Sequence, residues 1–144
     1  SILGSLDDVR VLDLFAGSGA LAIEALSRGA ASATLVDASR QAVAAVRRNL
    51  EELDLTAEVR QQPALTFLER ASRAGAQYDL VFLDPPYGQA GSLGRSLSSA
   101  LEPVLAPEAR VVAESDRREP LDLAPLVLID ERRYGDTMIR LYGP

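Results

Sequence analysis

Strand-length apolar runs alternate with helical patterns along this chain, and this alternation limits its fold more than any other feature. Parallel strands need a crossover connection, which a helix between consecutive strands supplies. The alternation therefore predicts an α/β fold with a seven-stranded, mostly parallel sheet and helices on both faces. Tyr134-Gly135-Asp136 predicts a turn between the last two strands, a hairpin that adds an antiparallel edge. We expect strands at 9–15, 32–36, 57–62, 78–83, 109–114, 126–133 and 137–142, and helices at 20–28, 41–53, 65–74 and 93–101.

The composition restricts the chemistry available to this protein. With 144 residues, 47% of them hydrophobic, the chain suits one domain with a substantial core. It contains no cysteine and no histidine, which removes disulfides, thiolate metal sites, the usual general base and the commonest metal ligand. We therefore expect no metal, and catalysis that depends on carboxylates, tyrosine, hydroxyls, backbone groups or a cofactor. No apolar run could span a membrane and no signal peptide opens the chain, so we expect a cytoplasmic protein.

The charge balance argues mildly against a large nucleic-acid footprint. The net charge is −6, and all 15 basic residues are arginines. Arginine doublets at 47–48, 117–118 and 132–133 are candidate phosphate contacts. Such doublets also occur on ordinary solvated surfaces, where arginine packs and pairs, so that interpretation stays beside the first.

The motif Asp84-Pro85-Pro86-Tyr87 follows an apolar run of strand length. Two prolines cannot continue a ladder, and a proline disfavours the helical region for the residue before it. Asp84 should therefore end the strand in an extended or turn conformation. Ligands of open α/β sheets bind outside the carboxyl ends of the strands. The motif predicts a fixed carboxylate and an aromatic ring at a ligand site, and an ordinary strand-to-loop turn is the alternative.

A glycine turn, Gly17-Ser18-Gly19, joins the first expected strand to the first expected helix. Glycines allow a tight turn and close approach of the backbone to a ligand, and the following helix offers free N–H groups. Asp37 ends the next strand about twenty residues later, where an acid can bind the hydroxyls of a ribose. Together these features predict an adenosine-type cofactor.

The identity of that cofactor depends on Asp13. The pattern Gly17-x-Gly19-x-x-Ala22 also satisfies the looser dinucleotide pattern, so NAD remains possible. A carboxylate close to the helix N-terminus would repel a pyrophosphate, whereas it would attract the α-ammonium group of S-adenosylmethionine. Asp13 has an alternative role, in which it braces the glycine turn through backbone N–H groups.

These stretches resemble the Rossmann-like S-adenosylmethionine-dependent methyltransferases. The string Asp13-x-Phe15-x-Gly17-x-Gly19 resembles their cofactor loop. The motif at 84–87 resembles the catalytic motif of those that methylate exocyclic or amide nitrogens. The longer strings at 11–21, 24–30 and 134–137 are similar to the bacterial RsmD family, which methylates the N2 amine of a guanine in 16S ribosomal RNA. The resemblance covers nearly the whole chain.

The resemblance implies roles for single residues. Asp84 and the carbonyl of Pro85 would accept the N–H groups of the target amine, and Pro86 would help to fix their geometry. Tyr87 would stack on the unstacked base. We expect 16S ribosomal RNA as the partner, within a small-subunit particle, and a monomeric enzyme without membrane contact. The cofactor would contact Asp13, Phe15, Ala16, Gly17, Gly19, Asp37, Ala38, Ala64 and Leu65.

The chain departs from the family in two places. The family normally begins with a basic stretch of some tens of residues that helps to hold cofactor and RNA. We expect residues 1–144 to form one methyltransferase domain without that stretch. Many such enzymes also carry an acid just after the third strand that contacts the adenine amine, where this chain reads Gln62-Pro63-Ala64-Leu65. We therefore expect backbone groups and apolar contact with Ala64 and Leu65 to bind the adenine.

Three alternatives remain. An N6-adenine DNA methyltransferase or a glutamine-amide methyltransferase would use similar motifs, although no target-recognition domain is visible. An NAD-dependent oxidoreductase would bind NAD and would leave the motif at 84–87 unexplained. A non-catalytic Rossmann-like module would bind neither cofactor.

Overall fold

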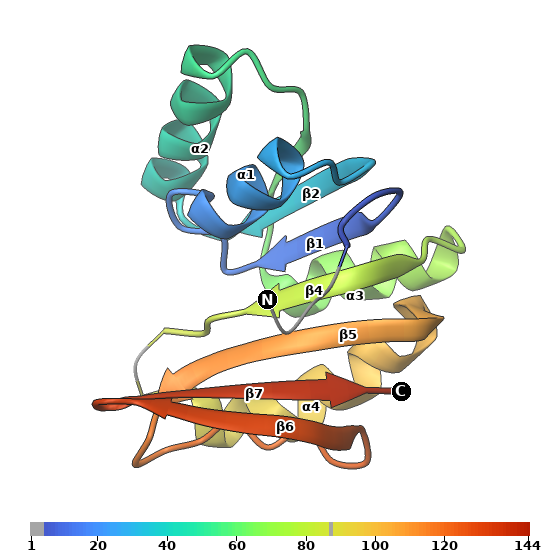
Figure 1. Ribbon diagram of the computed structural model, residues 1–144, viewed down its shortest axis with the longest axis vertical. Helices are drawn as coiled ribbons and strands as arrows, with labels where there is room; N and C mark the ends of the chain where they lie inside the picture. The colour runs from blue at the N-terminus through green and yellow to red at the C-terminus, as the bar shows by residue number, and fades with distance from the viewer. Residues whose placement is uncertain (1–4, 87) are drawn as a thin grey trace.

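The structure, a computed structural model, describes residues 5–86 and 88–144, so Tyr87 lies outside the described residues. A seven-stranded sheet forms the centre of the molecule, with strands in the order β3-β2-β1-β4-β5-β7-β6 (Figure 1). The strands are β1 (Arg10–Leu14), β2 (Ser32–Asp37), β3 (Glu58–Gln61), β4 (Tyr78–Leu83), β5 (Leu105–Asp116), β6 (Val127–Tyr134) and β7 (Thr137–Gly143). The helices are α1 (Ala20–Ser27), α2 (Arg40–Glu52), α3 (Ala64–Arg73), α4 (Ala90–Leu101) and the 3-10 helix η1 (Glu102–Val104).

The predicted α/β fold is confirmed. Strands β1 to β5 pair in parallel, and a helix lies between each pair of consecutive strands. The last two strands form the predicted hairpin, in which β7 pairs antiparallel with both β5 and β6. The hairpin therefore inserts β7 beside β5 and leaves β6 at the sheet edge.

The fifth strand begins earlier than the sequence predicts. We expected a strand from residue 109, whereas β5 starts at Leu105. Pro103 lies in the first turn of η1, where its missing N–H is no loss. Pro107 lies where the pairing of β4 with β5 slips between Tyr78 and Leu80. A proline cannot donate to the ladder and is therefore found at such irregularities.

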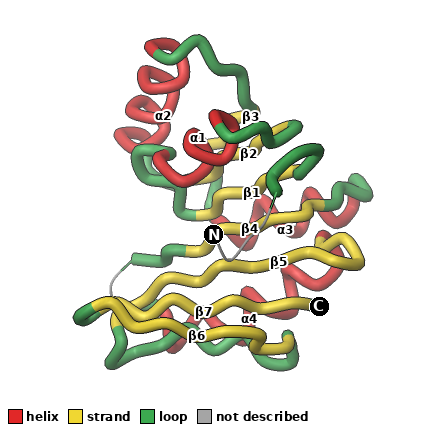
Figure 2. Tube along the Cα trace, in the orientation of Figure 1, coloured by secondary structure: helices red, strands yellow, loops and turns green. Residues whose placement is uncertain are grey.

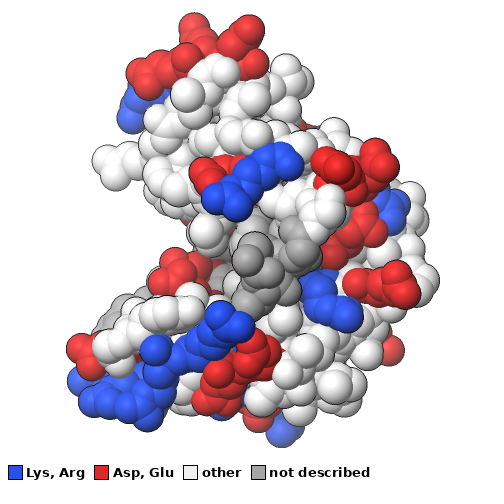
Figure 3. Space-filling view, viewed as in Figure 1, with Lys and Arg blue, Asp and Glu red and all other residues white. Residues whose placement is uncertain are grey.

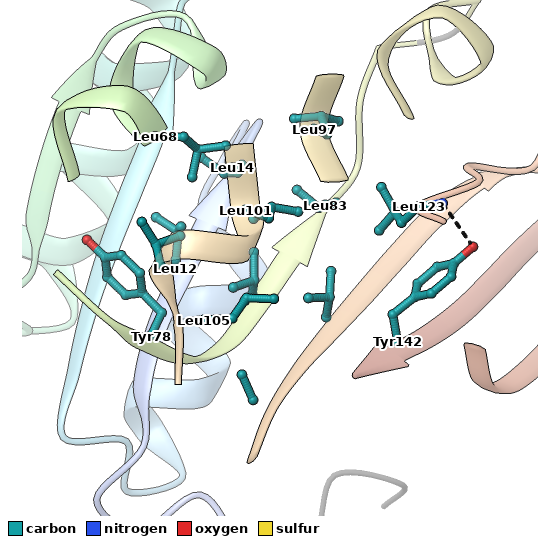
Figure 4. Close-up of a cluster of buried hydrophobic side chains, with 14 of the residues drawn as sticks. Leu12, Leu14, Leu68, Tyr78, Leu83, Leu97, Leu101, Leu105, Leu123 and Tyr142 are labelled. Carbon is teal, nitrogen blue, oxygen red and sulfur yellow. Dashed lines mark hydrogen bonds between the residues drawn. The ribbon is translucent and has the colours of Figure 1, made fainter. Parts of the chain in front are cut away.

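The helices cover the two faces of the sheet in pairs. Figure 2 shows α1 and α2 on one face and α3 and α4 on the other. The alternation along β1 accounts for this division, because Val11 packs in the cluster under α1 and α2, whereas Leu12 and Leu14 pack in the cluster under α3 and α4. Figure 4 shows the second cluster, in which Leu97 and Leu101 of α4 meet the sheet.

Buried hydroxyl groups tie the segment between β5 and β6 to the core, and that of Ser98 in α4 donates to the carbonyl of Ala124 at 3.0 Å. The Tyr142 hydroxyl donates to the carbonyl of Leu121 at 2.7 Å and accepts from the N–H of Leu123 at 3.4 Å (Figure 4). Leu121 and Leu123 are themselves fully buried, so this stretch is held firmly. No helix within residues 5–86 and 88–144 has both the length and the apolar character needed to cross a membrane.

Candidate active site

The carboxyl ends of the parallel strands bring the predicted site residues to one edge of the sheet. Leu14, the last residue of β1, pairs with Val36 of β2 and with Leu83 of β4. Because the three strands are in register, Asp37 and Asp84 come next at the same edge. The arrowheads of β1 and β4 point to this edge in Figure 1, and the space-filling view is hollowed there (Figure 3).

A cavity of about 340 Å³ opens beyond the ends of β1, β2 and β3. Its size falls within the usual range for small-molecule sites, and most of its lining is apolar. Five of the predicted cofactor residues line it, namely Phe15, Asp37, Ala38, Ala64 and Leu65. The remaining lining residues are Val36, Gln62, Pro63, Pro86, Gln89, Leu93 and Leu97.

The glycine turn is braced by Asp37. One carboxylate oxygen of Asp37 accepts from the N–H of Gly17 at 3.0 Å, and the other accepts from the N–H of Ser39 at 2.8 Å. Gly19 has a φ of +83°, and a Cβ atom there would lie 2.8 Å from a methyl group of Leu35. The turn therefore requires glycine at position 19, both for its backbone conformation and for space. Asp37 thus fixes the turn and faces the cavity at the same time.

Asp13 lies below this turn, out of contact with solvent. Only 3% of its surface is exposed, and among the described residues its Oδ2 atom has no hydrogen-bond partner. Burial raises the pKa of Asp13 to about 7, and the neighbouring carboxylates Asp84 and Asp37 add to the rise. A backbone hydrogen bond from Ala22, in the first turn of α1, acts in the opposite direction. Asp13 is therefore an acceptor that lacks a positively charged partner.

Asp84 follows β4 at the point where the chain leaves the sheet. It keeps part of its surface in contact with solvent, whereas Pro85 beside it is buried. Partial burial raises the pKa of Asp84 to about 6, and Glu114 on β5 contributes through charge repulsion. This carboxylate is thus ionised at neutral pH but can still take up a proton.

A second, smaller cavity lies on the other side of the Asp-Pro-Pro segment. It measures about 200 Å³, and Pro86 lines both this cavity and the larger one. Its other lining residues are Pro85, Gly88, Ser115, Asp116, Arg118 and Glu119. Pro86 therefore forms a wall between an apolar space and a more polar one, whereas Asp84 lines neither cavity. A wider opening near Arg10 and Asp79, at the opposite end of the strands, is a weaker candidate because these two residues pair with each other at 2.8 Å.

Some of the predicted cofactor residues do not line the larger cavity, whereas some residues that were not predicted do. Asp13, Ala16, Gly17 and Gly19 belong to β1 and the glycine turn and do not line the larger cavity, and Tyr87 lies outside the described residues. Sequence reasoning missed Gln62 as a cavity residue and also missed the contribution of α4. The spacing of Leu93 and Leu97, one helical turn apart, was the available signal, but it did not indicate which face of α4 meets α3.

Two of the three arginine doublets come together at the hairpin. The backbone N–H of Arg117 donates to the carbonyl of Asp136 at 2.7 Å, which holds the loop after β5 against the hairpin turn. Arg132 and Arg133 lie on β6 beside that turn, and basic side chains gather at this part of the surface in Figure 3. Acids offset part of this charge, since Arg118 pairs with Asp116 at 2.9 Å. The third doublet lies apart from these, on α2.

The comparisons with known proteins agree on a family. The family model described as Conserved hypothetical protein 95 matches residues 1–143. The chain belongs to this family. The resemblance to RsmD proteins is confirmed, because the chain is 37% identical over 139 residues to Ribosomal RNA small subunit methyltransferase D of Escherichia coli (strain K12). That alignment covers 94% of this chain and 68% of the relative.

Solved structures extend the same result to the fold. A conserved hypothetical protein from Streptococcus pyogenes is 36% identical, with a TM-score of 0.79 over 95% of this chain and 86% of that one. A SAM-dependent methyltransferase from Agrobacterium tumefaciens is 21% identical, with a TM-score of 0.73 over 94% of this chain and 56% of that one. The RsmD-family chain thus shares the Rossmann-like fold of methyltransferases well beyond its own relatives, which confirms the predicted fold class.

Proposed function

We propose that this protein transfers a methyl group from S-adenosylmethionine to the exocyclic N2 amine of a guanine in 16S ribosomal RNA. The observation that carries the proposal is the position of Pro86, which follows Asp84 by two residues and lines a cavity on each side. A group transfer needs two ligands held on opposite sides of the reacting atoms, and the wall formed by Pro86 offers each of them a cavity. The similarity to Ribosomal RNA small subunit methyltransferase D of Escherichia coli supports ribosomal RNA as the acceptor.

The larger cavity and its surroundings suit S-adenosylmethionine better than a dinucleotide. Asp37 would bind the ribose hydroxyls, and Asp13 would face the ammonium group. Asp37 and Asp84 already raise the pKa of Asp13, so this region favours an added cation and would resist a pyrophosphate. Phe15, Ala64 and Leu65 would contact the base. When bound, S-adenosylmethionine supplies a methyl group on a sulfonium centre.

The Asp-Pro-Pro segment would activate the amine. The lone pair of an aromatic amine is delocalised into its ring, so the amine is a weak nucleophile. The carboxylate of Asp84 and the carbonyl of Pro85 would accept its two N–H groups and direct the lone pair toward the methyl carbon. Methyl transfer would leave S-adenosylhomocysteine, and Asp84 or water would take the proton that the nitrogen then loses. Tyr87 would stack on the base.

The smaller cavity would receive the base after it leaves the RNA stack. Arg118 at its rim and the doublet at 132–133 near by would contact phosphates of the same RNA. We propose that the substrate is 16S RNA within a small-subunit particle and that the enzyme acts as a monomer in the cytoplasm. Naked RNA and assembled particles, offered in parallel, distinguish the two forms of substrate.

Transfer of labelled methyl from S-adenosylmethionine to small subunits that lack the modification tests the proposal. Label should appear as N2-methylguanosine. Label in N6-methyladenosine would support methyl transfer to an exocyclic amine but contradict guanine as the target base. Asp84→Asn should lower transfer about 100-fold or more and leave S-adenosylhomocysteine affinity unchanged. Asp122→Asn, an exposed carboxylate in the loop before β6, is the matched control and should have full activity. Equal loss of affinity and transfer in Asp84→Asn would contradict the assigned role.

A further inference from the structure

Gln62 lines the larger cavity and carries an acceptor that has no partner among the described residues. It follows the last residue of β3 and lines the cavity together with Phe15, Ala64 and Leu65. Its side-chain Oε1 is buried, and among the described residues it has no hydrogen-bond partner. A buried carbonyl oxygen without a donor is unfavourable, so such an atom indicates a place where a ligand donor completes the site.

The position of Gln62 relative to Asp37 restricts which donor can reach it. The backbone N–H of Gln62 donates to the carbonyl of Asp37 at 3.1 Å, so the two residues are neighbours across the ends of β2 and β3. A nucleoside whose ribose hydroxyls meet Asp37 therefore extends its base toward Gln62. The space between them is apolar and suits the flat faces of a base.

Backbone donors at the start of α3 follow Gln62 closely along the chain. Helix α3 begins at Ala64 after Pro63, and no side chain caps its first turn. The N–H of Leu65, in that first turn, has no acceptor within the helix. An acceptor from Gln62 next to a donor from the helix start is the complement of one edge of adenine, where the exocyclic amine donates and N1 accepts.

We propose that Gln62 is the residue that selects adenine in the cofactor, with Oε1 accepting from its exocyclic amine. This inference rests on the proposed function, because it concerns how the same cofactor is recognised. It adds a side-chain hydrogen bond to the backbone groups and apolar contacts that we expect to bind the base. A glutamine would then do by hydrogen bonding what an acid after the third strand does elsewhere in the superfamily.

A purely structural role for Gln62 makes a different prediction. Gln62 also borders a cavity of about 260 Å³ between β3 and α3, which Glu58, Arg60 and Tyr78 help to line. If its amide served only to fill that space, its removal would loosen the start of α3 and weaken every ligand of the larger cavity equally. If Gln62 selects the base, its removal would instead weaken the binding of one ligand and leave the binding of another unchanged.

Binding of two ligands by titration calorimetry separates these roles without any measurement of methyl transfer. The ligands are S-adenosylhomocysteine and S-inosylhomocysteine, in which an oxygen replaces the amine. The parent protein should prefer the adenosyl ligand about tenfold or more. In Gln62→Leu this preference should collapse through loss of adenosyl binding, with the inosyl ligand bound as before. Gln62→Glu, which keeps an acceptor, should retain the preference.

The matched control is Gln61→Leu, because Gln61 is the exposed neighbour on β3 and does not line the cavity. It should bind both ligands as the parent does. An unchanged preference in Gln62→Leu, an equal loss of both ligands, or a parent protein that prefers the inosyl ligand would each overturn the inference and leave the proposed function intact. A parent protein that binds neither ligand would overturn both.

Discussion

The substitution Asp13→Asn should make the protein more stable at neutral pH. Burial raises the pKa of Asp13 to about 7 from an ordinary value of 3.8, so the folded protein binds this proton more tightly than the unfolded chain does. Between these two pH values the folded state carries the extra proton, and the free energy of unfolding therefore falls as pH rises. A tenfold difference in proton affinity is worth about 1.4 kcal/mol, so ionisation of Asp13 costs the folded state about 4 kcal/mol above pH 7.

Urea unfolding at a series of pH values measures this difference. An asparagine keeps an acceptor for the Ala22 N–H and has no charge to bury. Asp13→Asn should unfold near the parent midpoint at about pH 4 and about 2 M urea later at about pH 8, for a slope near 2 kcal/mol per molar. Asp79→Asn is the control of opposite sign, because Arg10 holds the pKa of Asp79 below its usual value. That variant should lose stability at neutral pH and recover relative to the parent as the pH falls through the pKa of Asp79.

A stability difference for Asp13→Asn that stays constant from about pH 4 to about pH 8 would refute the reasoning, because it would show that Asp13 does not change its charge on folding. The same variant tests the ligand side. If Asp13 faces the cofactor ammonium group, the stabilised variant should bind S-adenosylhomocysteine more weakly. Gain of stability with full affinity would assign Asp13 to the fold alone.

Two further predictions concern the same edge of the sheet. The carboxylate form of Asp84 is the proposed acceptor, so the transfer rate should rise with pH to a plateau above about 6. Glu114→Gln should move that rise to lower pH, because the glutamine no longer repels the ionised Asp84. A rise at the same pH in the variant would show that the charge of Glu114 does not affect the pKa of Asp84. Gly19→Ala should unfold at a lower urea concentration than Gly75→Ala and should lose cofactor affinity. Both glycines have a positive φ, but of the two only a Cβ at position 19 meets a side chain, that of Leu35 at 2.8 Å. Equal stabilities of the two variants would mean that the turn can shift to make room.

The sequence predicts the sheet well because each strand has a local signal. Strand β4 has the predicted bounds, 78–83, because the proline after Asp84 has no N–H group and cannot continue the hydrogen bonding of the strand. The start of β5 has no such signal. Leu105 joins the sheet only because the pairing of β4 with β5 slips around Pro107, and register between distant strands is a tertiary property.

The candidate site likewise contains residues with a local signal in the sequence and residues without one. Gly19 and Asp37 follow from local requirements, a positive φ and an acid at a strand end, and the structure places both at the turn. The sequence marks 62–65 only as a place that lacks the acid of related enzymes, and the proposed role of Gln62 arises because its buried oxygen has no donor among the described residues. An unsatisfied atom is a property of all the groups around it, so no pattern within β3 or α3 could predict it.

The arrangement of charge explains why one edge of an acidic protein can accept both ligands. Asp13, Asp37 and Asp84 concentrate negative charge where the cofactor would bring an ammonium and a sulfonium centre. Arg118 lines the smaller cavity, and Arg117 and the doublet at 132–133 lie at the hairpin, where RNA phosphates would approach. Since Pro86 lines both cavities, the cationic and the anionic ligand would meet only at the wall that Pro86 forms. This separation keeps the phosphates away from Asp13, so the two ligands need not compete for the same field.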